Sequence, residues 1–301
     1  MTETAEDTLC NQENWALFGP AGNAESFFAA GHKSGLEAPK WVRDHGLDCY
    51  EYQCGHGVRI SDDAAEILGK RAAEEKVLLS IHAPYYISLS STEKEKRDRS
   101  ILYILSTLHA AQKMGAERIV VHAGSCGSIT RREALELAKD TLYRALDAAE
   151  NAGYGDILIC PETMGKVKQL GNIEEIIKLC SMSDRLLPTI DFGHVNAQTL
   201  GGLKQKEDFA RLLDQLEQKL SPYQAHCFHA HYSRIEYTNA GEKKHHTYAE
   251  TEYEPEFAPL ADLLAERGLT PRIICESAGT QTEDAVTIQN LYQERMEERH
   301  V

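Results

Sequence analysis

Two short runs, Val77-Leu78-Leu79-Ser80-Ile81-His82 and Ile119-Val120-Val121-His122, stand on either side of a long segment that is rich in charged residues. Both runs have the length and the apolar character of buried β-strands, and residues 93–114 between them carry apolar side chains at helical spacing. A strand, a helix and a second strand in this order indicate a β-α-β unit with parallel strands. Each of the two strands ends at a histidine.

The same alternation continues along the chain of 301 residues. The predicted strands cover residues 16–18, 49–53, 77–81, 119–121, 157–160, 186–190, 225–228 and 273–275. The predicted helices cover residues 37–45, 62–75, 93–114, 131–151, 173–181, 207–219, 257–267 and 283–298. Eight strands alternating with eight helices favour an α/β fold, the closed (β/α)8 TIM barrel. We expect one domain over residues 1–301, with a short tail at residues 1–14 and an active-site loop insertion at residues 230–256.

The composition argues against several classes of protein. The apolar runs are four or five residues long, far below the about 20 residues that span a bilayer, so no membrane segment is expected. Residues 1–8 are polar and acidic, unlike an export signal, so we expect a cytoplasmic protein. Lys and Arg total 32 and Asp and Glu 47, and the net charge of −15 repels nucleic acid unless positive charge is concentrated locally. No protein partner is evident.

Most of the predicted strands end at a side chain that can bind a metal ion. These side chains are His82, His122, Glu162, Asp191, His194, His229 and Glu276. In a barrel of parallel strands the carboxyl ends open on one face, so these residues should meet in one cup. Clustered carboxylates repel one another unless cations lie between them. Imidazole and carboxylate ligands without thiolate suit catalytic zinc, manganese or iron, so the sequence predicts a site for several metal ions.

Six short segments lie at these strand ends. They are His82-Ala83-Pro84-Tyr85-Tyr86-Ile87, Val121-His122-Ala123-Gly124-Ser125, Pro161-Glu162-Thr163-Met164-Gly165, Ile190-Asp191-Phe192-Gly193-His194, Phe228-His229-Ala230-His231 and Cys275-Glu276-Ser277-Ala278-Gly279. With these six segments in this order, the chain resembles the endonuclease IV family of apurinic/apyrimidinic endonucleases, within the wider xylose-isomerase-like barrel superfamily. The resemblance extends from about Trp15 to Glu294.

The resemblance implies two to three zinc ions, with manganese or iron as possible replacements. It implies that His82, His122 and Glu162 bind a first ion. Glu162 would bridge to a second ion, which Asp191, His229 and Glu276 also bind. A third ion would lie between His194 and His245 of the loop insertion.

The loop insertion departs from the family pattern. The family has an aspartate two residues before the loop histidine, and here Lys243 stands in that place. A protonated lysine cannot bind a metal ion and repels it. Either Glu242, His246 or His231 substitutes for the aspartate, or the third site is weak or absent.

The resemblance further implies a hydrolase that cuts phosphodiester bonds at abasic sites in DNA repair, with abasic DNA as its partner. Glu162 and Glu276 would be catalytic, as metal ligands, as residues that orient the attacking water, or as both. Tyr85 and Tyr86 stand where the family wedges residues into the duplex, although aromatic residues that cap the barrel mouth would look the same. Basic residues in predicted loops could form a positive rim or only a solvated surface: Arg59, Lys166, Lys168, Arg234, Lys243 and Lys244.

Two other functions remain open from the sequence. A sugar isomerase or epimerase of the same superfamily needs one metal ion, which Glu162, Asp191, His229 and Glu276 could hold, and it acts on a small sugar. The histidines beyond this quartet favour the hydrolase, whereas the acidity of the chain and Lys243 favour the isomerase. A barrel that binds metal without turnover is the third possibility.

Overall fold

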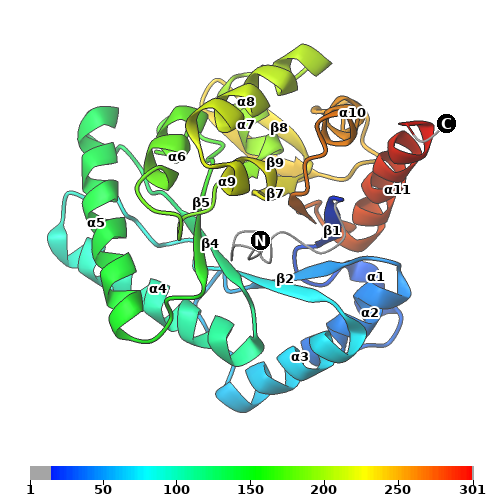
Figure 1. Ribbon diagram of the computed structural model, residues 1–301, viewed down its shortest axis with the longest axis horizontal. Helices are drawn as coiled ribbons and strands as arrows, with labels where there is room; N and C mark the ends of the chain where they lie inside the picture. The colour runs from blue at the N-terminus through cyan, green and yellow to red at the C-terminus, as the bar shows by residue number, and fades with distance from the viewer. Residues whose placement is uncertain (1–14, 300–301) are drawn as a thin grey trace, which may run out of the picture.

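A computed structural model describes residues 15–299, so the predicted tail at residues 1–14 lies outside the described residues. Its main sheet has eight parallel strands, which helices surround on the outside (Figure 1). The strands are β1 (Leu17–Pro20), β2 (Cys49–Gln53), β3 (Leu78–His82), β4 (Arg118–His122), β5 (Leu158–Glu162), β6 (Thr189–Asp191), β7 (His229–Tyr232) and β10 (Arg272–Cys275). They follow one another around the sheet in chain order. The predicted TIM barrel is confirmed.

The first two strands meet and close the barrel. Ala21, which follows β1, forms a parallel bridge with Glu51 of β2. The backbones approach most closely at Gly19, where a Cβ atom would lie 1.8 Å from the carbonyl oxygen of Cys49. Any side chain at position 19 would collide with the neighbouring strand, so closure at this seam requires glycine.

The predicted helices are present, with ends that agree with the prediction within two residues. They are α2 (Ala38–Asp44), α3 (Asp62–Glu75), α4 (Lys94–Met114), α5 (Arg131–Asn151), α6 (Ile173–Cys180), α8 (Lys206–Lys219), α10 (Ala258–Arg267) and α11 (Gln281–Arg299). The structure adds the short helices α1 (Glu25–Ala29), η1 (Gly35–Glu37), α7 (Phe192–Gln198) and α9 (Pro222–His226). Within residues 15–299, none of the helices combines the length and the apolar character that a membrane span requires.

The predicted strand at residues 225–228 is wrong. Residues 222–226 form α9, and β7 begins at residue 229 instead of residue 225. The hydroxyl of Ser221 accepts the backbone N–H of Gln224, and the Gln224 side chain accepts the backbone N–H of Ser221. This reciprocal capping, with Pro222 at the first helical position, starts a helix where the apolar residues suggested a strand.

The predicted loop insertion at residues 230–256 contains regular structure. It begins inside β7 and continues as an antiparallel hairpin of β8 (Arg234–Thr238) and β9 (Gly241–His246). Arg234 is 2% exposed and donates to the carbonyls of Tyr248, at 2.8 Å, and Tyr253 and to the carboxylate of Glu256, at 2.8 Å. Arg234 therefore holds this segment together and does not contribute to the positive rim that the sequence predicts.

Successive residues of each strand face different cores. Val121 and Ile159 belong to the large apolar core that includes residues of the surrounding helices. Val120 and Cys160, one position away, form a separate small cluster with Leu187. This cluster lies in the interior of the barrel, as the two-residue period of a strand requires. The next inward position on β4 and β5 is the last residue of each strand, at the open end.

The contacts of Arg234 predict a measurable contribution to stability. Arg234→Met should lower the free energy of unfolding by about 2–4 kcal/mol, because it leaves two carbonyls and a carboxylate without their donor. Lys243→Met serves as a control and should cost much less, since its ion pair with Glu236 is solvent-exposed. Urea denaturation followed by circular dichroism measures both. Equal losses in the two variants would contradict this role of Arg234.

Candidate metal centre

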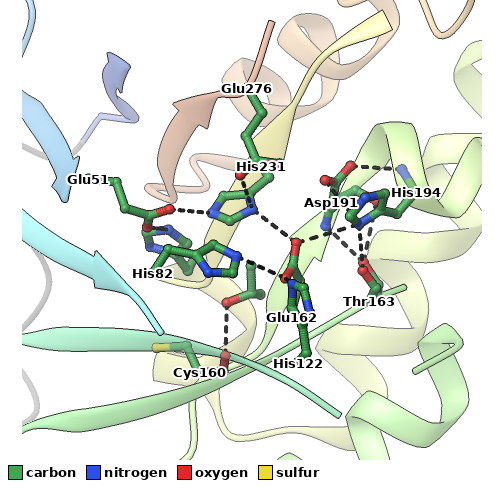
Figure 2. A network of polar contacts seen from close by, with 12 residues as sticks. Glu51, His82, His122, Cys160, Glu162, Thr163, Asp191, His194, His231 and Glu276 are labelled. Atoms are coloured by element: carbon green, nitrogen blue, oxygen red, sulfur yellow. Dashed lines mark hydrogen bonds and ion pairs between the residues drawn. The ribbon is translucent and has the colours of Figure 1, made fainter. Parts of the chain in front are cut away.

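Glu162, the last residue of β5, is fully buried at the open end of the barrel. Its Oε2 atom lies 3.3 Å from Nε2 of His82 and 3.1 Å from Nε2 of His122 (Figure 2). The sheet register explains the contact, because His122 pairs directly with Glu162 and His82 ends the next strand, β3. These three side chains offer ligand atoms within 4.8 Å of one another and form the first ligand group.

The other oxygen of Glu162 faces a second ligand group. Oε1 of Glu162 lies 3.1 Å from Nδ1 of His231, and Oε1 of Glu276 lies 3.5 Å from the same nitrogen. Asp191 ends β6 and pairs with His231 in the sheet. Glu162, Asp191, His231 and Glu276 offer ligand atoms within 4.8 Å of one another. Glu162 thus belongs to both groups, with one oxygen facing each.

A third ligand group consists of Asp191, His194 and His245, whose ligand atoms also lie within 4.8 Å of one another. Asp191 caps α7 by accepting the backbone N–H of His194 at 2.7 Å. Oε2 of Glu242 lies 3.5 Å from Nε2 of His194, and its Oε1 lies 3.7 Å from Nε2 of His245. Glu242 therefore brings a carboxylate to the place where the family motif has an aspartate.

A bulge in the hairpin brings Glu242 to this place in preference to Lys243. Glu242 pairs with Tyr237, whereas Lys244 pairs with Glu236, so Lys243 is an extra residue in β9. The extra residue puts positions 242 and 245 on the same face of the strand, although in a regular strand residues two apart share a face. Lys243 is 57% exposed and forms an ion pair with Glu236.

The carboxylate oxygens of the centre fit metal binding better than hydrogen bonding. Among residues 15–299, no group donates a hydrogen bond to Oε2 of Glu162 or to Oδ2 of Asp191, and both atoms are buried. Imidazole nitrogens nevertheless lie close to both oxygens. Nδ1 of His194, for example, is 3.1 Å from Oδ2 of Asp191. Buried acceptors without donors are costly, and divalent cations at these points would remove the cost.

The imidazole rings are oriented as metal ligands would be. Nδ1 of His82 lies 2.9 Å from the carbonyl of Ala83, and Nδ1 of His194 lies 3.0 Å from the carbonyl of Thr163. A carbonyl only accepts, so each Nδ1 carries a proton, and it is Nε2 that presents a lone pair when the ring is neutral. Both Nε2 atoms face the carboxylates of the ligand groups. This is the tautomer that metal-binding histidines adopt when an outer partner fixes them.

The buried charges also shift one another's pKa values. Burial raises the pKa of Glu162, but the imidazoles of His122, His194, His231 and His82 outweigh it and hold the pKa well below its ordinary value. Burial lowers the pKa of His82, yet the carboxylate of Glu162 outweighs it and raises the pKa to about 9. In the metal-free protein, protons therefore occupy part of the site, and a metal ion must displace them to bind.

The structure does not bring His229, the fourth histidine named from the sequence, into these groups. Nε2 of His229 donates to Oε2 of Glu51 at 2.9 Å, and burial lowers the pKa of His229 to about 3. His231 stands beside Asp191 and Glu276 instead. The difference follows from the start of β7, because residues 229 and 231 are successive inward positions and residue 231 is nearer the open end.

Glu51 is a residue of this region that the sequence analysis missed. It is fully buried on β2, beneath the ligand groups, and contacts both His229 and His231. A signal was available, because β2 reads Cys-Tyr-Glu-Tyr-Gln and an acid at an inward position of a buried strand needs a partner.

The rim of the cup carries exposed aromatic and basic side chains. Tyr85 and Tyr86 are 57% and 41% exposed, and their rings contact each other edge to face. The ring of Tyr85 also contacts His56, and that of Tyr86 contacts Tyr103. The remaining exposed basic residues of the predicted rim are Arg59, Lys166, Lys168 and Lys244.

Comparison with known proteins finds relatives in sequence and neighbours in fold. An uncharacterized protein of Methanocaldococcus jannaschii, MJ0133, is 30% identical over 287 residues, which cover 94% of this chain and 99% of that protein. A probable endonuclease 4 of Malacoplasma penetrans is 30% identical over 124 residues, which cover 40% of this chain and 42% of that protein. The crystal structure of a D-tagatose 3-epimerase-like protein is 21% identical with a TM-score of 0.70, covers 94% of this chain and 100% of that one, and shares the fold.

A family model described as xylose isomerase-like TIM barrel matches residues 39–296. The match spans most of the chain and includes all of the ligand groups. With the closed barrel of parallel strands described above, it shows that the chain belongs to the xylose isomerase-like TIM barrel family.

Proposed function

We propose that this protein is a divalent-metal-dependent phosphodiesterase of the endonuclease IV type, which cleaves DNA at abasic sites. The observation that carries the proposal is the arrangement of three adjoining ligand groups, joined by Glu162 and Asp191. Phosphodiester hydrolysis by several metal ions requires them to lie close together, and shared carboxylates achieve this. The partial likeness to a probable endonuclease 4 supports the same reaction.

The residues have distinct roles in the proposed reaction. Divalent ions bound at the ligand groups would supply hydroxide at neutral pH and stabilise charge on the attacking and leaving oxygens. Glu162 is fully buried and sets the separation between the first and second groups. The side chain of Glu276 is 17% exposed, so its carboxylate can orient a water molecule and accept its proton. Tyr85 and Tyr86 offer exposed rings that can stack in the gap left by a missing base.

Electrostatics limit how DNA could bind. The chain has a net charge of −15, and two of the predicted rim cations, Arg234 and Lys243, are engaged with Glu256 and Glu236. Attraction for phosphate would have to come from the bound metal ions and the four remaining rim cations. Association with DNA should therefore be weaker than for a protein with a basic surface.

A sugar epimerase is the second candidate, and the second ligand group favours it. Three carboxylates and His231 could hold one metal ion that positions neighbouring oxygens of a sugar, and Glu162 or Glu276 could move a proton. This reaction needs neither the first nor the third ligand group. The acidic surface presents no obstacle to an uncharged substrate.

The first prediction concerns metal content. The purified protein should carry two to three divalent ions per chain, mainly zinc, in elemental analysis. Glu162→Gln should lose more metal than Glu276→Gln, because Glu162 faces two ligand groups and Glu276 one. Equal retention in the two variants would contradict the bridging role of Glu162. Less than about one ion per chain after expression with ample metal would overturn the proposal itself.

The third ligand group gives a second prediction. Glu242→Gln should weaken the last metal-binding step in a calorimetric titration, because an anionic ligand is lost. Lys243→Asp is the matched variant and should leave the titration unchanged, since position 243 is the outward-facing residue of the bulge. Tighter binding in Lys243→Asp would mean that position 243 reaches the metal and that our assignment of Glu242 is wrong.

The third prediction separates the two candidate reactions. Cleavage of an abasic duplex should fall steeply as salt rises. Tyr85→Ala and Tyr86→Ala should slow this cleavage by about tenfold to 100-fold, the loss of one stacking contact, and should affect a small aryl phosphodiester less. Tyr143→Ala, at an exposed position of α5, is the control. Interconversion of a ketose, without cleavage of abasic DNA in zinc, manganese or iron, would decide for the epimerase.

A further inference from the structure

Glu51 is held in one orientation by contacts to both of its carboxylate oxygens. Oε2 accepts the hydroxyl of Ser80 at 2.9 Å and the Nε2–H of His229 at 2.9 Å. Oε1 accepts the side-chain amide of Gln53 at 3.2 Å. The remaining close neighbour of Oε1 is Nε2 of His231, at 3.1 Å (Figure 2). The anchored carboxylate therefore faces one particular ring of the metal centre.

The ring of His231 stands between carboxylates on both sides. Its Nε2 faces Glu51, and its Nδ1 faces Glu162 at 3.1 Å and Glu276 at 3.5 Å. A neutral imidazole has one N–H and one lone pair. Among the described residues, Nδ1 forms a hydrogen bond with Glu162, whereas Nε2 lies close to Glu51 without forming one. If Nδ1 binds a metal ion instead, the proton of the neutral ring must lie on Nε2, beside the charge of Glu51.

The outer partner of His231 differs in charge from those of His82 and His245. The outer nitrogen of His82 contacts a backbone carbonyl at 2.9 Å, and that of His245 contacts the hydroxyl of Ser233 at 2.7 Å. Nδ1 of His194 lies 3.0 Å from the carbonyl of Thr163 and 3.1 Å from Oδ2 of Asp191, which itself belongs to the ligand groups. A carboxylate partner fixes the ring orientation and makes the imidazole a stronger ligand, and loss of such a partner costs about tenfold to 100-fold in metal affinity.

We propose that Glu51 is a positioning residue of the metal centre. It holds His231 with Nδ1 turned toward Glu162, Asp191 and Glu276, and so tightens metal binding at the second ligand group without binding the metal. His229 supports Glu51 from below. The inference rests on the metal dependence in the proposed function, but it does not depend on the substrate.

Glu51, His229 and His231 could alternatively bind a metal ion of their own, because their ligand atoms lie within 4.8 Å of one another. The geometry favours hydrogen bonding. Nε2 of His229 and Oε2 of Glu51 already form a hydrogen bond at 2.9 Å, and all three side chains are fully buried. A fourth ligand such as water would have no access from solvent.

The test measures zinc affinity of the metal-depleted, full-length protein by competition with a chromophoric chelator. Glu51→Gln should raise the Kd of one zinc site by about tenfold to 100-fold and leave the number of sites unchanged. Glu51→Asp keeps the charge and should recover part of the affinity. Ser80→Ala removes only the hydroxyl donor and should change the Kd by less than about threefold, since Glu51 keeps its charge. The absorption spectrum of bound cobalt should change in Glu51→Gln and not in Ser80→Ala.

Wild-type affinity in a folded Glu51→Gln variant would overturn the inference. Loss of one whole equivalent of zinc in both Glu51→Gln and His229→Asn would assign a separate metal site and overturn it too. If Glu51→Gln does not fold, Glu51→Asp decides, because its shorter side chain withdraws the carboxylate from His231 and keeps the charge: weaker binding with all sites retained is expected, and unchanged binding contradicts the inference. Tight zinc binding without cleavage of abasic DNA would refute the proposed function alone. A wild-type protein without tight zinc would refute both.

Discussion

Every second side chain of a closed parallel barrel must fit in an interior that excludes water, and this constraint determines where the chemistry of the protein can lie. Deeper in the barrel, apolar residues such as Val120, Cys160 and Leu187 share the interior with the buried guanidinium groups of Arg118 and Arg272, which donate to backbone carbonyls. The side chains of the ligand groups follow at the ends of the strands, where solvent is near. Glu51 and His229 are also buried in the interior, and the hydrogen bond between them lowers the cost of burying both.

The charges of the upper layer compensate one another locally. Glu162 keeps its negative charge despite burial because four imidazoles surround it, and its field in turn raises the pKa of His82. The overall charge of −15 lies mostly elsewhere, so it affects the encounter with a substrate more than the chemistry inside the cup. In the proposed function, selection between DNA and a neutral sugar would therefore depend on the rim, where two of the predicted cations are already engaged in ion pairs.

Long helices with clear periodicity could be predicted from the sequence almost to the residue, as α3 and α5 show, because their apolar stripes and caps agree. The seventh strand could not be predicted in this way, since apolar residues before His229 belong to the capped helix α9. Because of this error, His229 was expected as a ligand in the place that His231 occupies. Glu51 could not be predicted from the residues at strand ends, because it lies in the middle of β2, which ends in glutamine. The role of Glu242 depends on pairing across the hairpin, which local sequence does not encode.

The bulge at Lys243 has a consequence for how relatives of this chain can be identified. In a regular β-strand an acid and a histidine that face the same way are separated by one residue, whereas here Glu242 and His245 are separated by two. The extra residue at position 243 sets the direction of the Glu242 side chain, and the length of that side chain lets its carboxylate reach His245. Chains that keep the shorter spacing should have a hairpin without the bulge. A sequence search that requires a fixed spacing between the acid and the histidine would therefore separate such chains from this one. A search that asks only whether the two residues lie on the same face of the strand would keep them together.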